Sequence, residues 1–325
     1  MTSAPMAQAI AVAQRARRLS PPNPWVGAVV VDPSGEVISS GFTQEPGGAH
    51  AEIQALAGAG ERAQGSTLYV TLEPCCHQGR TGPCTSVIID AGVARVVVGV
   101  RDPDSQVAGK GIDTLVAAGI AVDVGDGDED IREQLAPYLW HRQHGRPFVI
   151  LKMGATLDGR TAMADGSSQW ITSADARRDV HELRADSDAI VVGAGTVRAD
   201  NPELTARDAS PRRDPRRVVL GTAPDGARIH PCDEFSGPLG DLLDQLGADG
   251  VLQLMVEGGA HVASDFLEAG LVNRVVAYVA PAVAGSEGGR GMFDGLRTPT
   301  MDALRRGRFT EVRRVGSDVR LELEL

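Results

Sequence analysis

The sequence lacks long apolar runs. No uninterrupted apolar stretch reaches the ~18 residues that a membrane-spanning helix needs. The N-terminal segment carries its charges, Arg15, Arg17 and Arg18, after its apolar residues. A secretory signal places its charges before them. We therefore expect a cytoplasmic protein that has no membrane partner.

Positive charge is also scarce. The chain holds 32 Lys and Arg against 43 Asp and Glu, a net charge of −11, and only Lys110 and Lys152 are lysines. Residues 1–145 hold 10 cations and 16 anions, and residues 146–325 hold 22 and 27, so both parts are acidic. Proteins that bind nucleic acid tightly gather cations in clusters. Nucleic acid is therefore not an expected partner.

Cysteine is rare, and its distribution is uneven. Three of the four cysteines, Cys75, Cys76 and Cys84, fall in one short segment, whereas Cys232 is isolated. A disulfide framework would spread its cysteines along the chain. Clustering in a chain of this size instead predicts metal or redox chemistry in a reducing compartment.

The length of 325 residues predicts two domains. Residues 126–146 are first acidic and then basic, and they end in a Gly-Arg-Pro sequence. We place the boundary there, between a domain at 1–145 and a domain at 146–325.

Strands and helices alternate along the first domain, which predicts a layered α/β fold. Helices are expected at 5–19, 50–60, 84–90 and 110–118, and strands at 26–32, 37–42, 67–72, 94–100 and 120–124. In the second domain we expect a helix at 173–184 and strands at 148–153, 188–193, 217–220 and 251–256. Asp158-Gly159 predicts a hairpin turn before a short strand, and Gly316-Ser317 predicts one between strands 309–315 and 319–325.

Two motifs in the first domain point to a metal. His50-Ala51-Glu52 comes first, and Glu73-Pro74-Cys75 follows with Cys84 nine positions later. One imidazole and two thiolates suit Zn²⁺, and three protein ligands leave a fourth position for water, whose pKa zinc lowers to about 7. Glu52 follows His50 by two residues at a helix start, beside the metal, where it can move protons. Zinc deaminases use His-x-Glu with Pro-Cys-x-x-Cys, and the gap here is longer.

Other interpretations of this segment stay open at the level of residues. Cys76 could close a structural zinc site, which would make the domain a non-catalytic binding module. A nucleic-acid or nucleoside base deaminase that carries an accessory domain is the main alternative enzyme. The histidines outside the motifs lack ligand-type spacing and are interpreted as structural: His141, His144, His181, His230 and His261.

Glycine-rich turns stand out in the second domain. Ile190–Gly195 and Leu252–Gly259 each end a strand and open a helix, whose N-terminal N–H groups suit phosphates. Neither turn has the third glycine of a dinucleotide fingerprint, so alone each favours a structural role. Lys152 lies in a mostly apolar strand, where it is either a proton donor or a surface lysine.

The motifs resemble the bifunctional deaminase–reductases of riboflavin biosynthesis over nearly the whole chain. The segments that carry the resemblance are 23–24, 50–52, 71–84, 101–103 and 108–111, followed by 152–160, 168–172, 195–202 and 256–259. The insert 77–83 is absent from cytidine deaminases and nucleic-acid base editors. The chain departs from the family pattern at Cys76, Asp104 and Gly221, and its stretch 208–251 is shorter.

The resemblance implies a cytidine-deaminase-like three-layer α/β/α domain followed by a dihydrofolate-reductase-like α/β domain. It implies zinc-dependent deamination of 2,5-diamino-6-(5-phosphoribosylamino)pyrimidin-4-one, then NADPH-dependent reduction of the ribosyl side chain to ribityl. The partner is thus a small phosphoribosyl pyrimidine, and the resemblance leaves room for a homo-oligomer through the reductase domain.

The resemblance also assigns roles to residues. The metal ligands are His50, Cys75 and Cys84; the catalytic groups are Glu52 and, as the proton donor, Lys152. The deaminase substrate would contact Asn23, His77, Arg80 and Asp102, and the reductase substrate Ser168, Arg184, Leu204, Arg207 and Glu257. NADPH would contact Gly154, Ala155, Trp170, Thr196, Asp200, Gly258 and Gly259.

Overall fold

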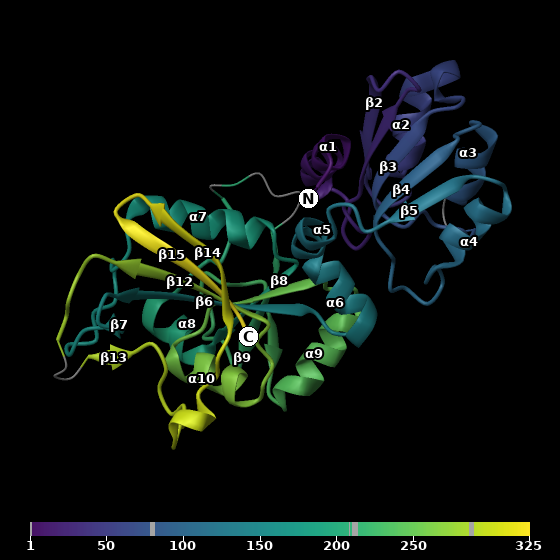
Figure 1. Cartoon of the computed structure of the whole chain (residues 1–325). Coiled ribbons are helices and arrows are strands. Elements are labelled where there is room, and N and C mark those ends of the chain that lie inside the picture. The colour runs from purple at the N-terminus through teal and green to yellow at the C-terminus, as the bar shows by residue number, and fades with distance from the viewer. Residues whose placement is uncertain (1, 79–81, 208, 210–213, 286–288) are drawn as a thin grey trace. The chain divides into compact units, whose positions relative to one another are not determined.

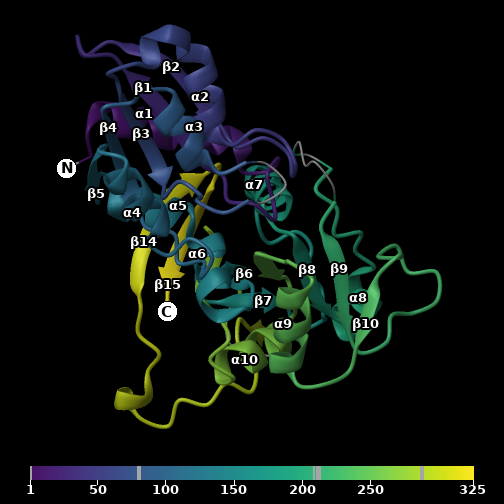
Figure 2. The ribbon, with the colours of Figure 1, turned by 90° about the vertical axis from the view of Figure 1, so that its right-hand side faces the viewer.

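The structure is a computed structural model that describes residues 2–78, 82–207, 209, 214–285 and 289–325 (Figures 1 and 2). The chain forms two compact units, Met1–Gly145 and Arg146–Leu325. Within the described ranges, no helix has both the length and the apolar character needed to cross a bilayer.

The first unit is built on a five-stranded sheet in the order β2-β1-β3-β4-β5. Its strands are β1 (Gly27–Val31), β2 (Val37–Phe42), β3 (Thr67–Leu72), β4 (Arg95–Val100) and β5 (Ala121–Val124). β1 runs antiparallel to β2 and β3, whereas β3, β4 and β5 run parallel. The carboxyl ends of β3 and β4 therefore lie at one edge of the sheet, next to the start of β1.

Helices cover both faces of this sheet (Figure 1). They are α1 (Ala4–Ala13), α2 (Ala51–Ala59), α3 (Cys84–Asp90), α4 (Lys110–Ala117), α5 (Asp128–Gln134) and α6 (Ala136–His144). A Cβ atom on Gly27 would lie 2.0 Å from the Ala9 carbonyl oxygen of α1, and one on Gly41 would lie 2.4 Å from the Ala51 carbonyl oxygen of α2. Gly41 pairs with Ala28, the neighbour of Gly27, so α1 and α2 lie on opposite faces. The predicted three-layer domain is confirmed.

The second unit contains an eight-stranded sheet in the order β10-β9-β8-β11-β6-β12-β15-β14. Its strands are β6 (Phe148–Thr156), β8 (Ala189–Gly193), β9 (Arg216–Leu220), β10 (Asp233–Phe235), β11 (Gln253–Val256), β12 (Arg274–Ala280), β14 (Arg308–Val315) and β15 (Asp318–Glu324). The first six in the sheet order are parallel, and the β14–β15 hairpin extends the sheet in antiparallel fashion.

The helices of the second unit are α7 (Ala174–Ala185), α8 (Ala194–Asp200), α9 (Leu239–Ala248) and α10 (Ala260–Glu268). α9 and α10 bury Leu243 and Phe266 in the core against Val275 of β12. α7 lies on the other face, where the Tyr278 hydroxyl, three residues beyond Val275, donates to Asp179 at 2.6 Å. This confirms the reductase-like α/β architecture.

Two local predictions are wrong. The helix expected at 5–19 ends at Ala13 and continues as a 3-10 helix, Gln14–Ala16, where the Arg17 N–H bonds to the Gln14 carbonyl three residues back instead of four. The segment 126–146, where the domain boundary was predicted, holds α5 and α6. Its acidic-then-basic order matches the helix dipoles, with acids in the first turn of α5 and bases in the last turn of α6.

The second wrong prediction is the hairpin at Asp158-Gly159. Strand β7 (Arg160–Ala162) pairs with β13 (Arg290–Gly291) instead of folding back on β6. The Asp158 carboxylate accepts the N–H groups of Ala284 and Gly285, at 3.1 and 2.7 Å, and so binds the turn to this distant loop. The hairpin at 309–325 is confirmed, because Val315 pairs with Asp318 around a two-residue turn.

The contact between Gly27 and α1 gives a stability prediction. We expect Gly27→Ala to lower the free energy of unfolding by about 3 kcal/mol, because its methyl group would overlap the Ala9 carbonyl. Gly82→Ala, which adds a methyl group into open space, should change it by less than about 0.5 kcal/mol. Urea unfolding measures both, and equal stability of the two variants would refute the packing described here.

Candidate metal centre and active-site cavity

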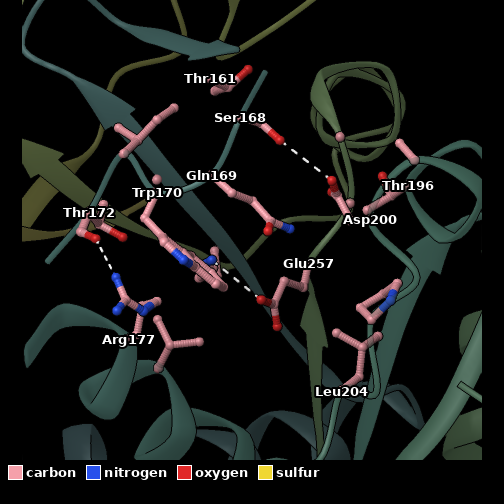
Figure 3. Close-up of a pocket in the computed structure, with 18 of the residues that line it drawn as sticks. Thr161, Ser168, Gln169, Trp170, Thr172, Arg177, Thr196, Asp200, Leu204 and Glu257 are labelled. Atoms are coloured by element: carbon pink, nitrogen blue, oxygen red, sulfur yellow. Dashed lines mark hydrogen bonds and ion pairs between the residues drawn. The ribbon is translucent and has the colours of Figure 1, made fainter. Parts of the chain in front are cut away.

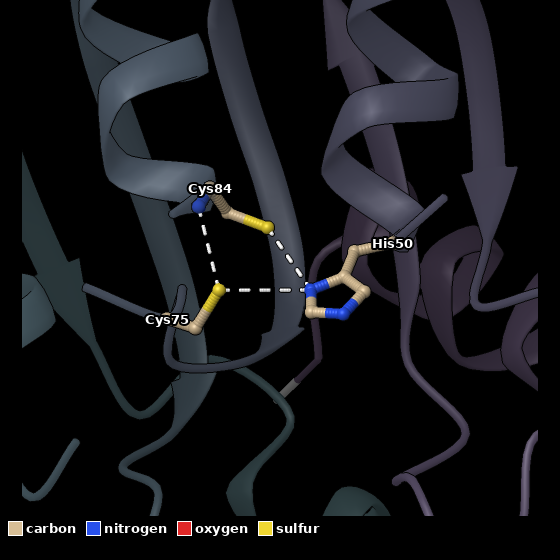
Figure 4. A group of neighbouring side chains, drawn as sticks. All are labelled: His50, Cys75 and Cys84. Atoms are coloured by element: carbon tan, nitrogen blue, oxygen red, sulfur yellow. Dashed lines mark hydrogen bonds between the residues drawn. The ribbon is translucent and has the colours of Figure 1, made fainter. Parts of the chain in front are cut away.

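Three donor side chains meet in the first unit (Figure 4). His50 is the residue before α2, Cys75 follows β3, and Cys84 is the first residue of α3. Their donor atoms all lie within 4.8 Å of one another. Two helix starts and one strand end thus converge at a single point.

The spacing of the donors fits zinc. His50 Nδ1 lies 3.2 Å from Cys84 Sγ and 3.6 Å from Cys75 Sγ. Tetrahedral zinc with normal Zn–N and Zn–S bonds separates such atoms by about 3.6 Å. The Sγ of Cys76 is instead 3.8 Å from the Gln106 carbonyl, outside the donor group. The described residues therefore offer three ligands, the open set of a catalytic site rather than a closed structural one.

The surroundings of the two ligand thiols, Cys75 and Cys84, shift their pKa values in opposite directions. The Cys84 thiol and N–H and the His50 ring surround the Cys75 sulfur and lower its pKa to about 4. The same neighbouring sulfur, together with burial, raises the pKa of Cys84. A cation that binds both sulfurs as thiolates therefore displaces a proton.

Glu52 lies in the first turn of α2 and is only 4% exposed. Burial, followed by the negative charge of Cys75, raises its pKa. Its carboxyl group also bonds to the Cys84 side chain. A carboxyl group with a raised pKa next to a metal site can both accept and return a proton.

Glu73 belongs to the Glu-Pro-Cys motif and had no predicted role. Its buried carboxylate accepts four backbone N–H groups, those of Asp102 at 3.3 Å, Gly109 at 3.1 Å, Gly111 at 3.0 Å and Ile112 at 3.2 Å. These bonds tie the metal loop to the end of β4 and to the start of α4. The sequence signal for this role was a charged residue that follows a buried strand directly and precedes a metal ligand by two positions.

Three of the predicted deaminase substrate residues fall around this edge of the sheet. Asn23 precedes β1, and its N–H bonds to the Ser20 carbonyl at 2.9 Å. His77 follows the metal loop, and its Nδ1 is buried without a hydrogen-bond partner among the described residues. Asp102 follows β4, whereas Arg80 lies outside the described residues. Their contacts with substrate stay predictions.

Hydrogen bonds hold the Asp102 carboxyl group in place, and one of them comes from the last helix of the first unit. Its carboxyl group, 5% exposed, accepts the Tyr138 hydroxyl of α6 at 3.1 Å and the Asp104 N–H at 2.9 Å. Burial raises its pKa to about 6 despite these bonds. Arg142 of α6 pairs with Asp104 at 3.2 Å.

The second unit contains a cavity of about 830 Å³ (Figure 3). All but one of the predicted reductase residues line it: Lys152, Gly154, Ser168, Trp170, Arg184, Thr196, Asp200, Leu204, Arg207, Glu257, Gly258 and Gly259. Ala155 is fully buried in β6 and is not among the lining residues. The cavity also exposes residues without a predicted role, among them Arg177, His181, Glu203 and Arg228.

The two glycine-rich turns lie side by side on the cavity wall. A Cβ atom on Gly259, which precedes α10, would lie 3.3 Å from the Thr196 hydroxyl of α8. One on Gly258 would lie 2.6 Å from the Val262 Cβ. The glycines therefore leave a backbone-lined shelf between two strand ends, which fits the close approach of a dinucleotide.

A partly buried charge cluster lines the cavity. Glu257 accepts two hydrogen bonds from Arg184, at 2.7 and 2.9 Å, and one from Lys152 at 3.3 Å. Burial would raise the pKa of Glu257, but the two cations lower it to about 2. Arg184 also donates to the Thr205 carbonyl, so its donors are largely used within the protein.

Trp170 is 69% exposed at the cavity, and the Arg177 guanidinium stacks on its ring at 4.4 Å. Arg177 also donates to the Thr172 carbonyl at 2.7 Å, and Ser168 lies 3.4 Å from Asp200 (Figure 3). Stacking on a cation fixes the orientation of an aromatic face that a flat ligand can cover.

Comparisons with known proteins agree over both units. Residues 2–100 match the cytidine and deoxycytidylate deaminase zinc-binding region, and residues 147–321 match the RibD C-terminal domain. Riboflavin biosynthesis protein RibD of Escherichia coli K12 is 40% identical over 363 aligned positions, which cover 98% of each chain. The same protein of Corynebacterium ammoniagenes is 46% identical and covers 83% of this chain and 82% of its own. The solved structure of Acinetobacter baumannii RibD, form 1, is 38% identical over 98% of this chain and 97% of that chain, with a TM-score of 0.91.

The donor geometry predicts zinc content. We expect Cys84→Ser to lose most bound zinc, because a hydroxyl group replaces one thiolate ligand. Cys76→Ser should retain zinc, because its sulfur lies outside the donor group. Elemental analysis of the purified variants measures this, and zinc loss in Cys76→Ser would contradict a three-ligand site.

The raised pKa of Asp102 predicts a pH-dependent stability. Its pKa is 3.8 ordinarily and about 6 in the fold, so between these values the folded state binds more protons than the unfolded state. Stability therefore falls as pH rises from 4 to 6, by at most about 3 kcal/mol from this group. Asp102→Asn should remove this fall, as measured by urea unfolding of the first unit at each pH. Tyr138→Phe, which deletes a hydrogen bond to the carboxylate, should extend the fall to higher pH, and an unchanged profile in both variants would contradict the assignment.

Proposed function

The chain belongs to the RibD family of bifunctional riboflavin-biosynthesis enzymes, and from this premise we propose the chemistry of each unit. The first unit removes an amino group from 2,5-diamino-6-(5-phosphoribosylamino)pyrimidin-4-one, and the second reduces the ribosyl group of the product to ribityl with NADPH. The observation that carries the deaminase proposal is the three-ligand set beside the buried carboxyl group of Glu52.

For deamination, His50, Cys75 and Cys84 would hold the zinc. When bound, the zinc would supply a water that is activated at neutral pH. Glu52 takes the proton of the attacking water on its carboxylate and delivers it to the departing amino nitrogen, so ammonia leaves. The raised pKa of Glu52 suits this exchange, because a carboxyl group that holds its proton more tightly than usual can accept a proton and then return it. Asn23, His77 and Asp102 would orient the pyrimidine and its ribosyl group.

For reduction, the shelf formed by Thr196, Gly258 and Gly259 would hold the dinucleotide, with Trp170 and Asp200 beside it. NADPH would supply the hydride for reduction at C1′ of the ring-opened ribose. Lys152 is the proposed proton donor to the imine nitrogen, so that one hydride and one proton are added. Glu257 orients the Lys152 ammonium at 3.3 Å. Arg184 holds Glu257 in place with two bonds, which makes it a positioning residue in this scheme.

Both proposed catalytic residues can be tested with one pair of variants. We expect Glu52→Gln to retain zinc and to lose ammonia release by at least a factor of about 100, because the proton carrier is gone. Lys152→Met should lower NADPH oxidation with the deaminated intermediate by a similar factor. Ammonia assays and absorbance at the NADPH band measure the two steps on the full chain.

Each variant serves as the control for the other. Glu52→Gln should still oxidise NADPH when it is given the deaminated intermediate, and Lys152→Met should still release ammonia. If Glu52→Gln deaminates at the normal rate, Glu52 is not the proton carrier. If the wild-type chain does not oxidise NADPH with the intermediate, the reductase proposal fails.

A further inference from the structure

The loop that follows β4 carries two carboxyl groups close together. Asp102 and Asp104 are two residues apart, and the Asp104 N–H donates to Asp102 Oδ1 at 2.9 Å. Asp102 is buried, and the side chain of Asp104 is 25% exposed. Like charges at this spacing oppose each other's ionisation, and burial opposes it further. Asp102 therefore needs a positive charge nearby if it is to remain a carboxylate at neutral pH.

Helix α6 supplies such a charge. Arg142 Nε lies 3.2 Å from Asp104 Oδ2, and the side chain of Arg142 is 27% exposed. The guanidinium also lies over the ring of Tyr138, 4.9 Å from its centroid, and Tyr138 is the residue whose hydroxyl donates to Asp102. Residues four apart share one face of a helix. A single face of α6 thus contacts both carboxyl groups, one through a phenol and the other through a cation.

Other charged residues near Asp102 do not compensate the two carboxyl groups. Glu73, which follows β3, is an acid and accepts the Asp102 N–H at 3.3 Å. Lys110 of α4 donates to the Ser105 carbonyl at 2.8 Å. Arg101, the residue before Asp102, is exposed. Within the described part of the chain, none of these three forms an ion pair with either carboxyl group of the loop.

Tyr138 and His141, the neighbours of Arg142 on α6, add no charge. Burial, followed by the negative charge of Asp102, raises the pKa of Tyr138, so its phenol stays neutral and donates its proton to a hydrogen bond. His141 Nδ1 lies 3.1 Å from Arg142 Nη1. Because a guanidinium can only donate, this ring nitrogen accepts and carries no proton. Arg142 is therefore the charge that this face of α6 brings to the loop.

The pKa of Asp102 is consistent with this arrangement. Burial raises it to about 6, the charge of Asp104 raises it as well, and the charge of Arg142 lowers it. Asp102 is thus ionised at neutral pH by a small margin. Removal of Arg142 would delete a charge that lowers this pKa and would leave Asp104 uncompensated beside it.

We propose that Arg142 is a positioning residue of the deaminase: it neutralises Asp104, so that Asp102 stays an ionised carboxylate that accepts hydrogen bonds from the substrate. Arg142 does not touch the substrate in this scheme and acts through Asp104. The proposal rests on the deaminase function proposed above and on the predicted contact of Asp102 with substrate.

The pH dependence of kcat/KM for ammonia release by the full chain tests this proposal. We expect Arg142→Gln to move the acid limb of the profile to higher pH by roughly one unit, which lowers kcat/KM on that limb by about tenfold. Asp104→Asn should move the limb to lower pH, because it removes the charge that opposes ionisation. The double variant should return it close to its wild-type position, and Arg142→Lys, which keeps the charge, should leave it there.

Arg132→Gln is the matched control. Arg132 pairs with Asp128 at 2.8 Å within α5, and its side chain is 52% exposed. Its loss should leave the profile unchanged, and all of the variants should retain zinc. An acid limb that stays in place in folded Arg142→Gln, or that Asp104→Asn does not restore in the double variant, overturns the proposal. Zinc loss in Arg142→Gln also overturns it, because Arg142 would then act through the metal loop.

Urea unfolding at each pH gives a readout that is independent of turnover. Arg142→Gln should extend above pH 6 the range over which stability falls as pH rises, because the folded-state pKa of Asp102 moves further above its unfolded value of 3.8. The double variant should not show this extension, and an extension of equal size in both would refute the role of Asp104. If the wild-type chain releases no ammonia, the deaminase function fails, whereas the unfolding series still decides whether Arg142 acts on Asp102.

Discussion

The first unit depends on the buried carboxylate of Glu73. None of its described hydrogen bonds comes from a cationic side chain. Glu73 accepts four backbone N–H groups from the end of β4 and the start of α4. A buried charge is tolerated only when such bonds replace its water. The four bonds therefore fix the chain at Glu73, two residues before Cys75, and at Asp102 on the neighbouring strand. The metal loop and the predicted substrate residue are thus positioned by the same group.

The second unit also contains a carboxylate whose charge must be compensated, and it uses different partners to do so. Glu257 also follows a buried parallel strand, β11, but two cations rather than backbone groups compensate its charge. In both units the predicted sites gather where parallel strands end, as is general for open α/β sheets. In the second unit, glycines at two adjacent strand ends clear space for a ligand, whereas in the first unit side chains at the strand ends approach a metal.

The sequence predicted best where rare residue types carry the chemistry. His50, Cys75 and Cys84 could be selected because few residue types bind zinc, and the structure brings them together. The sequence predicted least where the role of a residue depends on a hydrogen bond to a residue far away along the chain. The bonds of Glu73 reach residues 29 to 39 positions away, and Asn201 binds Arg228 across 27 positions. Strand β12 and helix α9 were not predicted, and the charge pattern of α5 and α6 was interpreted as the place of the domain boundary and not as two helices.

The hydrogen bond from Tyr138 to Asp102 shows how much of the chain the first unit needs to support its predicted substrate residue. The matched zinc-binding region ends at residue 100, yet the hydroxyl that supports Asp102 comes from α6, the last helix before Gly145. A fragment trimmed to the family match would keep every metal ligand but would lose Asp102 and Asp104 themselves, together with the helix whose Tyr138 and Arg142 bind them. The second unit begins at Arg146, so along the chain it follows directly after the helix whose Tyr138 supports the predicted substrate residue Asp102.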